Sequence, residues 1–394
     1  MTCTYGELSK LGFGFMRLPT VEVDGEKVID IELVKEMADL FMDAGFTYFD
    51  TARGYHGGRS EAALKAAVVD RYPRDSFQVA TKLPAWMAKD AADARAMFDT
   101  SLEQTGAGYF DFFLLHNLGE SLTPGFEEYG LWEFCAQKKA EGKIKKFGFS
   151  IHDNAEELEK VLDAHPEVDF VQLQINYVDW ESDIIQSRKC YEVCQERGLP
   201  VVIMEPVKGG TLVKLPEAVA DVLRETEPGA SIASWALRFA GSLPNVIAVL
   251  SGMNTPEMVA ENVAIMRDGV PLTEGEHAVI ERARETLAAL PGVPCTDCRY
   301  CMKGCPEGVH INTIMQSLNI YDQMGDAYRA QENYNWNTGA GKASVCIQCG
   351  ACIHSCPFGA IGSKTFLVDV INLIKAGKKV VAMVAPATEG QYGP

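Results

Sequence analysis

The sequence predicts an α/β protein that consists of a closed (β/α)₈ barrel followed by a smaller, cysteine-rich unit. Three observations predict this arrangement. Short apolar runs alternate eight times with amphipathic stretches over roughly 250 residues, which is the size of such a barrel. Eight of the 12 cysteines fall between Cys295 and Cys356. The charge changes at the same place: residues 286–394 contain eight Lys/Arg and seven Asp/Glu, a net charge of +1, so residues 1–285 carry −19 of the total of −18.

The composition excludes several classes of protein. Apolar residues make up 47% and charged residues 23%, which is typical of a folded globular chain. A protein that binds nucleic acid by neutralising phosphates is basic, whereas this chain is strongly acidic. The fully apolar runs are shorter than the ~20 residues that a membrane helix needs, and the first ten residues contain no signal-peptide core. We therefore expect a cytoplasmic protein that binds neither nucleic acid nor membranes.

The chain is predicted to divide into three parts. They are a barrel over residues 1–285, a cysteine-rich unit over 286–370 and a C-terminal tail over 371–394. The join is expected near the Pro- and Gly-containing segment at 287–295, because these residues interrupt regular structure.

The predicted strands are rich in β-branched and aromatic residues and are almost continuously apolar, as is typical of parallel strands covered on both faces. They are 11–18, 46–52, 77–83, 110–117, 145–151, 168–176, 200–206 and 246–252. Helical periodicity is clear at 30–45 and 154–165, where apolar residues recur every three or four positions. The alternative is an open sheet that binds a dinucleotide, but the sequence has no G-x-G-x-x-G motif after an early strand.

Polar side chains follow three consecutive predicted strands. Asp50 and Tyr55 follow the second strand, and Lys82 and His116 end the third and fourth. Functional groups of a (β/α)₈ barrel lie at these strand ends. A nearby lysine is expected to lower the pKa of a tyrosine from about 10, and a histidine can hydrogen-bond a carbonyl oxygen. Singly, each residue could equally be structural, but together they predict a proton-donating site suited to reducing a C=O bond.

These segments resemble the aldo/keto reductase family. The similarity is carried by DTARGYHGGRSE at 50–61, ATK at 80–82 and LLHN at 114–117, and it extends over about residues 8–270. The resemblance implies a TIM barrel in which Tyr55 is the general acid, Lys82 and Asp50 tune it, and His116 polarises the carbonyl. It also implies NAD(H) or NADP(H) as the cofactor and a small carbonyl or alcohol as the substrate.

The same resemblance implies residues that bind the nicotinamide cofactor. Ser150 and Gln174 match positions that hold the carboxamide, and Tyr177 is a candidate to stack on the nicotinamide ring. Gly252, Glu261 and Asn262 match the phosphate loop and the last helix of the family. The chain departs from the family in having no Lys or Arg between Gly252 and Glu261, which argues against a preference for NADPH and favours either NADH or weak nicotinamide binding.

Two cysteine runs follow the barrel. Each has the spacing C-x₂-C-x₂-C-x₃-C-P of bacterial ferredoxins, in which the fourth cysteine ligates the other cluster. The spacing predicts two [4Fe–4S] clusters, one on Cys295, Cys298, Cys301 and Cys356, the other on Cys346, Cys349, Cys352 and Cys305. Zinc is the alternative, but zinc sites use ligand pairs with longer spacers.

The two runs are separated by a long insert, of which 311–330 is predicted to be helical. Residues 378–393 resemble the segment that links the ferredoxin-like part of iron hydrogenases to their catalytic domain. The expected partner is therefore a redox protein, such as a ferredoxin, a flavoprotein or a hydrogenase-like protein, in an anaerobic organism. Nicotinamide transfers two electrons and each cluster accepts one, so a flavin is a possible additional cofactor.

Two functions remain open at this stage. The first is an enzyme that couples nicotinamide-linked redox of a carbonyl or alcohol to electron exchange through the clusters. The second is an electron-transfer subunit or docking module in which the barrel is not catalytic.

Overall fold

The computed structural model describes residues 10–119, 122–182, 185–268, 271–290, 292–293, 295, 300–356 and 360–361. The chain forms two compact units, Met1–Pro291 with Gln323–Gly325, and Gly292–Asp322 with Asp326–Pro394. The predicted tail at 371–394 lies outside the described residues. The domain limits proposed from the sequence stay a prediction.

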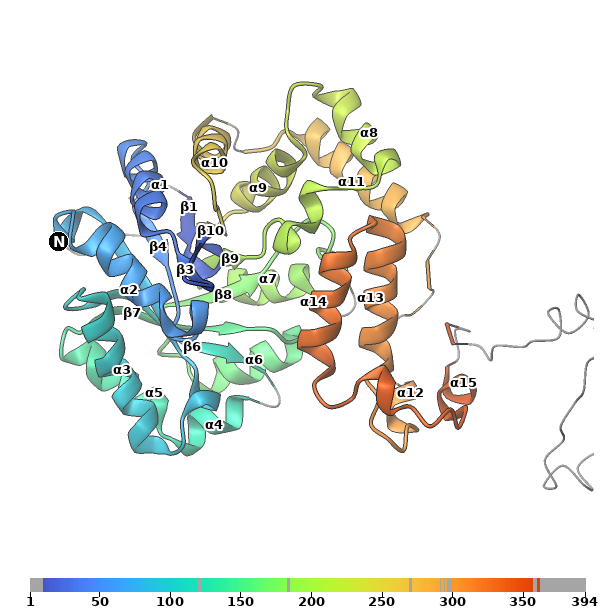
Figure 1. Cartoon of the computed structure of the whole chain (residues 1–394), viewed down its shortest axis with the longest axis horizontal. Helices are drawn as coiled ribbons and strands as arrows, with labels where there is room; N and C mark the ends of the chain where they lie inside the picture. The colour runs from blue at the N-terminus through green and yellow to red at the C-terminus, as the bar shows by residue number, and fades with distance from the viewer. Residues whose placement is uncertain are drawn as a thin grey trace, which may run out of the picture. The chain divides into compact units, whose positions relative to one another are not determined.

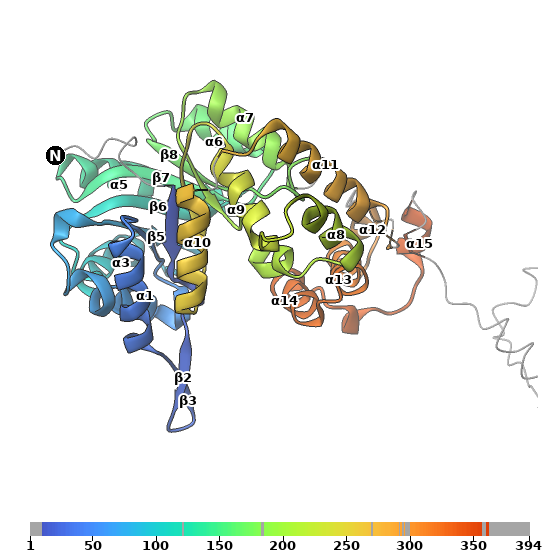
Figure 2. The same ribbon diagram turned by 90° about the horizontal axis from the view of Figure 1, so that it is seen from above.

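The first unit is a closed barrel of eight parallel strands in the order β1-β10-β9-β8-β7-β6-β5-β4 (Figures 1 and 2). The strands are β1 (Leu11–Gly14), β4 (Tyr48–Asp50), β5 (Gln78–Leu83), β6 (Phe110–Leu118), β7 (Ile144–Ile151), β8 (Phe170–Gln174), β9 (Val201–Met204) and β10 (Val246–Ser251). This confirms the predicted fold class, and each observed strand falls on one of the eight predicted segments.

The barrel interior is filled by side chains of alternate residues. Tyr48, Phe112, Phe170 and Leu250 are among the residues of this inner cluster. Because successive side chains of a strand point to opposite faces, the residue two positions further on also points inward. The interior is so crowded at Gly148 that a Cβ atom there would meet the carbonyl oxygen of Phe170 at 2.2 Å.

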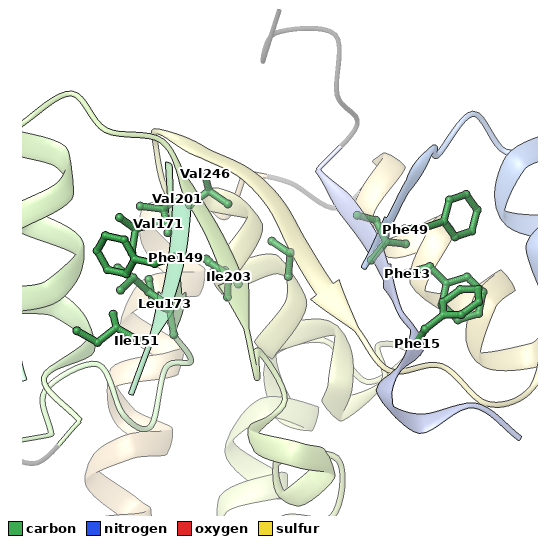
Figure 3. Packing of buried hydrophobic residues seen from close by; sticks show 14 of the residues in the cluster. Phe13, Phe15, Phe49, Phe149, Ile151, Val171, Leu173, Val201, Ile203 and Val246 are labelled. Atoms are coloured by element: carbon green, nitrogen blue, oxygen red, sulfur yellow. The ribbon is translucent and has the colours of Figure 1, made fainter. Parts of the chain in front are cut away.

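A larger hydrophobic layer lies between the strands and the surrounding helices. Figure 3 shows part of it, with Phe13, Phe15 and Phe49 on one side and Phe149 and Leu173 on another. The covering helices are α1 (Ile31–Asp43), α2 (Ser60–Leu64, continued by a π-helical segment at Lys65–Val69), α3 (Ala91–Thr105), α4 (Thr123–Glu128), α5 (Leu131–Ala140), α6 (Ala155–Ala164), α7 (Ser187–Glu196), α8 (Glu217–Thr226), α9 (Ile232–Ser242), α10 (Pro256–Asp268) and α11 (Glu274–Ala288).

Several helices begin at polar residues that cap them. Asp30, Asp90 and Asn154 accept a hydrogen bond from a backbone N–H in the first turn of α1, α3 and α6. These caps fix where the loop before each of these helices ends.

A two-stranded hairpin interrupts the simple alternation. β2 (Thr20–Val23) pairs with β3 (Glu26–Ile29), and Figure 2 shows the hairpin projecting from the barrel. Asp24 and Gly25 form its turn with positive φ angles of 52° and 83°. This hairpin was not predicted from the sequence, although Asp-Gly between alternating residues is typical of such a turn.

The second unit is helical in its described part. It contains α12 (Tyr300–Lys303), α13 (Ile311–Met324), α14 (Ala327–Thr338) and α15 (Ala351–Ser355). α13 and α14 lie side by side, and the Asn333 side chain donates a hydrogen bond to Ser317 Oγ across them (Figure 1). The predicted helical insert is thus confirmed. No described helix of either unit has the length and apolar character needed to cross a membrane.

Candidate functional site

The carboxyl end of the barrel brings together side chains from neighbouring strands. Asp50 lies two residues after Tyr48, and Lys82 lies two residues after Ala80, so both point inward above the filled interior. His116 on β6 and Ser150 on β7 follow the same rule. The pleat of the strands therefore places these four side chains in one layer.

Lys82 is the centre of this layer. Its ammonium group donates hydrogen bonds to Asp50 Oδ1 at 2.5 Å, to the Thr51 carbonyl oxygen at 2.9 Å and to the Tyr55 hydroxyl oxygen at 3.3 Å. The side chains of Lys82 and Asp50 are almost fully buried. A buried charge is tolerated only when it is paired and hydrogen-bonded, and this one has three partners.

Tyr55 is supplied by the loop that follows β4. Its backbone N–H donates to the Ala52 carbonyl, and the next residue, His56, accepts a hydrogen bond from the Leu18 backbone N–H at 3.1 Å. His56 and Gly57 have positive φ angles, which turn the chain sharply after Tyr55. These contacts hold the tyrosine hydroxyl over the lysine.

The protonation states suit proton donation. Burial lowers the pKa of Lys82, but Asp50 and Tyr55 outweigh it, so the pKa is raised and the ammonium stays charged. Burial raises the pKa of Tyr55, Lys82 lowers it, and Asp50 and Glu205 raise it further. Lys82 lowers the pKa of Tyr55, as expected, but burial together with the two carboxylates outweighs the lysine, so the net shift is upward. Tyr55 keeps its proton at neutral pH.

His116 lies beside Tyr55, with ring centroids 5.8 Å apart in an edge-to-face arrangement. Burial, together with the charges of Lys82 and His152, holds the pKa of His116 well below its usual value. The imidazole is therefore neutral at pH 7 and carries one N–H donor. Its Nδ1 atom is buried and has no hydrogen-bond partner among the described residues. The indole of Trp86 packs on the ring at 5.1 Å.

The residues expected to hold the nicotinamide are only partly brought together. Ser150 is buried at the end of β7, and its hydroxyl oxygen accepts the Asn117 backbone N–H at 2.8 Å. Gln174 ends β8. Its side-chain amide donates a hydrogen bond to Asp179 and forms another hydrogen bond with His152. Tyr177 lies apart from them. Its ring is buried in the layer between barrel and helices, where it packs against Phe239.

The loop after β10 precedes α10. Asn262 on α10 donates to Ser251 Oγ at 2.9 Å and so ties the helix to the strand end, whereas Glu261 is exposed. Gly252 begins the loop, and the aliphatic part of Arg17 covers it: a Cβ on Gly252 would meet Arg17 Cδ at 3.3 Å. The sequence contains no Lys or Arg between Gly252 and Glu261. The structure brings Arg17 to this loop from the segment after β1.

Sequence reasoning also missed four polar residues at the carboxyl end. His152 and Glu205 directly follow β7 and β9, so the strand-end rule that selected Lys82 would have selected them as well. Asp179 and Lys208 form an ion pair at 2.5 Å. No motif marks them, since the pair joins two loops that are distant in the sequence.

The second unit brings cysteines of both runs close together. Cys301 is buried in a small apolar cluster that includes Cys305 and Cys352. Burial raises the pKa of Cys352, and the thiols of Cys346 and Cys305 raise it further, so Cys352 of the second run lies near Cys305 of the first. Backbone N–H groups of Val309 and Gln348 donate to the sulfurs of Cys305 and Cys346.

Three of the four cysteines of the first run are described, because Cys298 lies outside the described residues. Cys346 and Cys349 are exposed, and Cys295 and Cys356 are half-buried. Within the part of the chain that the structure describes, no group of three His, Cys, Asp or Glu side chains gathers closely enough to hold a metal ion.

The family models decide the classification of the chain. The model of the aldo/keto reductase family matches residues 10–285, and that of a 4Fe-4S dicluster domain matches residues 294–361. The chain belongs to the aldo/keto reductase family. It is an oxidoreductase enzyme of that family that also carries a 4Fe-4S domain.

The curated relatives of this aldo/keto reductase have low sequence identity to it, but the match covers most of the length of each relative. The NADH-specific methylglyoxal reductase of Escherichia coli K12 is 24% identical over 330 residues, covering 71% of this chain and 96% of the relative. The uncharacterized oxidoreductase YtbE of Bacillus subtilis is 24% identical over 276 residues, covering 68% and 90%.

Solved structures agree with the barrel fold. The holo form of the aldo-keto reductase AKR11C1 from Bacillus halodurans has a TM-score of 0.57 and 24% identity, covering 70% of this chain and 92% of that one. An aldo-keto reductase from Klebsiella pneumoniae in complex with NADPH has a TM-score of 0.54 and 22% identity, covering 70% and 90%.

Proposed function

We propose that this aldo/keto reductase interconverts a small carbonyl compound and its alcohol with a nicotinamide cofactor. The observation that carries the proposal is the chain of contacts from Asp50 through Lys82 to Tyr55, with neutral His116 alongside. Such a cofactor would supply the hydride that is added to the carbonyl carbon.

The residues of the chain supply the proton and position the substrate. Tyr55 donates its phenolic proton to the carbonyl oxygen, and the Lys82 ammonium stabilises the phenolate that remains. Asp50 keeps Lys82 charged and fixed in place. The neutral imidazole of His116 donates a hydrogen bond to the same carbonyl oxygen, which orients the carbonyl toward Tyr55.

The residues at the strand ends fit a nicotinamide cofactor. The Ser150 hydroxyl accepts one hydrogen bond from the backbone and keeps its own proton for a carboxamide oxygen. The exposed backbone of Gly252, the beginning of α10 and the half-buried Arg17 provide a place for phosphate groups. The support for Tyr177 as the stacking residue is weaker, because its ring lies in the outer layer.

The test is carbonyl-dependent oxidation of NADH and NADPH by anaerobically purified protein. Methylglyoxal is the first substrate to try, because the Escherichia coli relative is named for it. We expect oxidation of the cofactor only when the carbonyl is present, with one alcohol formed per cofactor consumed. No carbonyl-dependent turnover with a panel of short aldehydes and ketones would overturn the proposal.

We also propose two [4Fe–4S] clusters with crossed ligation in the second unit. Cys305 of the first run packs in the same small cluster as Cys352 of the second, which supports crossed ligation, and Cys305 and Cys346 accept backbone hydrogen bonds, as cluster ligands do. Cys346 and Cys349 are exposed, so the cluster of the second run is the one that a redox partner protein can approach. Because a cluster accepts one electron at a time, a flavin in this protein or its partner would link it to hydride chemistry.

A further inference from the structure

The loop that carries Tyr55 continues in an unusual backbone conformation. His56, Gly57 and Gly58 have positive φ angles of 51°, 66° and 86°. Glycine adopts such angles freely, whereas a histidine adopts them only at a cost in free energy. Because His56 is the residue of the three that is not glycine, we expect its side chain to contribute something that glycine cannot.

The His56 imidazole binds the segment that follows β1. Its Nε2 atom accepts the Leu18 backbone N–H at 3.1 Å. Burial and the charge of Arg59 hold the pKa of His56 below its ordinary value, although a hydrogen bond with the Met16 backbone acts in the opposite direction. The ring is therefore neutral at pH 7, and Nε2 can accept. Its backbone partners, Met16 and Leu18, flank Arg17 on both sides.

The same segment is held at a second point. Ser60 begins α2, and its hydroxyl group donates a hydrogen bond to the Phe15 carbonyl oxygen at 3.0 Å. The loop between β4 and α2 thus binds the chain both before and after Arg17. Phe15–Arg17 forms a single 3₁₀ turn, and these bonds fix its position on the barrel.

The Arg17 side chain lies across the loop after β10. A Cβ atom on Gly252 would meet Arg17 Cδ at 3.3 Å and Arg17 Cβ at 3.4 Å, so the aliphatic part of the arginine packs on the Gly252 backbone. Arg17 is half-buried, and among the described residues its guanidinium has neither a hydrogen bond nor an ion pair. A half-buried charge without a partner in the chain indicates a place for an external anion, here beside the loop proposed for the phosphates.

We propose that His56 is a positioning residue for the cofactor, which fixes the Arg17 segment and so holds the guanidinium at the phosphate groups. This rests on the proposed function, because the phosphates are those of the nicotinamide cofactor. Since His56 directly follows Tyr55, one loop positions both the proton donor and the cation that binds the cofactor. Loss of the imidazole leaves the Leu18 N–H without its partner, lets the Arg17 segment move and weakens phosphate binding.

The test is a double-mutant cycle of His56→Gly and Arg17→Gln in the full-length, anaerobically purified protein. Calorimetry measures the Kd of NADPH and of NADH without any carbonyl compound. Glycine suits the left-handed backbone, so His56→Gly removes the imidazole without straining the loop. We expect His56→Gly to weaken the cofactor that Arg17→Gln weakens, by about fivefold when Arg17 is present and by less than about twofold in Arg17→Gln.

Asn245→Gly is the matched control. Asn245 also has a positive φ angle, of 62°, is half-buried, and binds backbone through its side chain, which donates to the Leu199 carbonyl oxygen at 2.6 Å. It directly precedes β10 and therefore lies at the opposite end of the barrel. This variant should bind both cofactors as the wild type does.

Unchanged cofactor binding in His56→Gly would overturn the proposal, as would no loss of binding in Arg17→Gln. An equal loss with and without Arg17 would also overturn it, because His56 would then act independently of the arginine. The same loss in Asn245→Gly would assign the effect to a general loosening of the barrel. All of these results leave the reductase function in place. Cofactor binding as expected without reduction of any carbonyl would overturn the proposed function alone, and a wild type that binds neither cofactor would overturn both.

Discussion

The Tyr55 hydroxyl lies 3.3 Å from Lys82 Nζ and is the proton donor of the proposed reaction. Tyr55→Phe removes the proton and keeps the ring, so the packing against His116 is preserved. We expect kcat to fall by roughly 10²–10⁴ with little change in cofactor affinity, measured by steady-state kinetics and by fluorescence titration. A Tyr55→Phe protein with full turnover would exclude the mechanism and favour a barrel that is only a docking module.

The neutral His116 makes the stability of the barrel depend on pH. Its pKa is depressed in the folded state, so between about pH 6.5 and the lower folded value the unfolded chain binds a proton that the folded chain does not. The free energy of unfolding should therefore fall on acidification below pH 6.5, by up to about 1.4 kcal/mol per pH unit. In His116→Gln, which does not titrate, urea denaturation at pH 7.5 and 5.5 should show a smaller loss. An equal loss would assign the acid sensitivity to other groups.

We propose that Arg17, whose side chain covers Gly252, provides a positive charge that residues 253–260 of the loop lack. If the guanidinium of Arg17 binds the 2′-phosphate, Arg17→Gln should weaken NADPH binding by about tenfold and leave NADH binding almost unchanged. Calorimetric titration of both cofactors measures this. An equal loss for both would place the guanidinium at the pyrophosphate, and no loss for either would remove it from the site.

Residues that end a strand and point inward could be predicted from the sequence. The alternation of side chains along a strand and the position of the strand's end suffice to place them. Asp50, Lys82, His116 and Ser150 are of this kind. Tyr177 follows a strand in an irregular loop, where no period fixes the direction of a side chain. Arg17 follows β1, and it lies next to the loop after β10 because β1 and β10 are neighbours in the closed barrel. A search confined to residues 252–261 could therefore not find it.

Among the elements, β7 and β8 are packed so closely that one position requires glycine. A Cβ at Gly148 would lie 2.2 Å from the Phe170 carbonyl oxygen, which is backbone and moves only with its strand. We expect Gly148→Ala to destabilise the barrel by about 1–3 kcal/mol, measured by urea denaturation. Gly125→Ala is the matched control, since nothing lies within 4 Å of a Cβ there and α4 gains helix propensity. Equal stability of the two variants would contradict the close packing.

The strands were predictable as elements because each is a short apolar run between amphipathic helices. Their number and order fix the closed barrel once the parallel connections are given. The β2–β3 hairpin was missed because its residues are mostly exposed and polar, so apolar periodicity does not reveal it. Two helices, α4 and α5, lie between β6 and β7, and two more, α8 and α9, lie between β9 and β10. The alternation therefore departs from one helix per strand at these two places.

For the whole molecule, the two cysteine runs predict about eight iron and eight acid-labile sulfide per chain. Cys305→Ser should damage the cluster of the second run, because Cys305 packs in one cluster with Cys352 of that run. Iron and sulfide analysis with electron paramagnetic resonance of the reduced protein checks both expectations. Stoichiometric zinc without sulfide would contradict the clusters, and loss of the first run's signal instead would contradict the crossed ligation.

The closed ring of strands also has a consequence for how the chain is made. β1 pairs with β4 on one side and with β10 on the other. β4 follows soon in translation, whereas the segment from Leu11 to Ser251 takes roughly 12–50 s to leave a ribosome at 5–20 residues per second. During this time one edge of β1 lacks its neighbour, and an open edge is where strands of other chains add. The nascent barrel is therefore most vulnerable to misassembly before its last strand emerges.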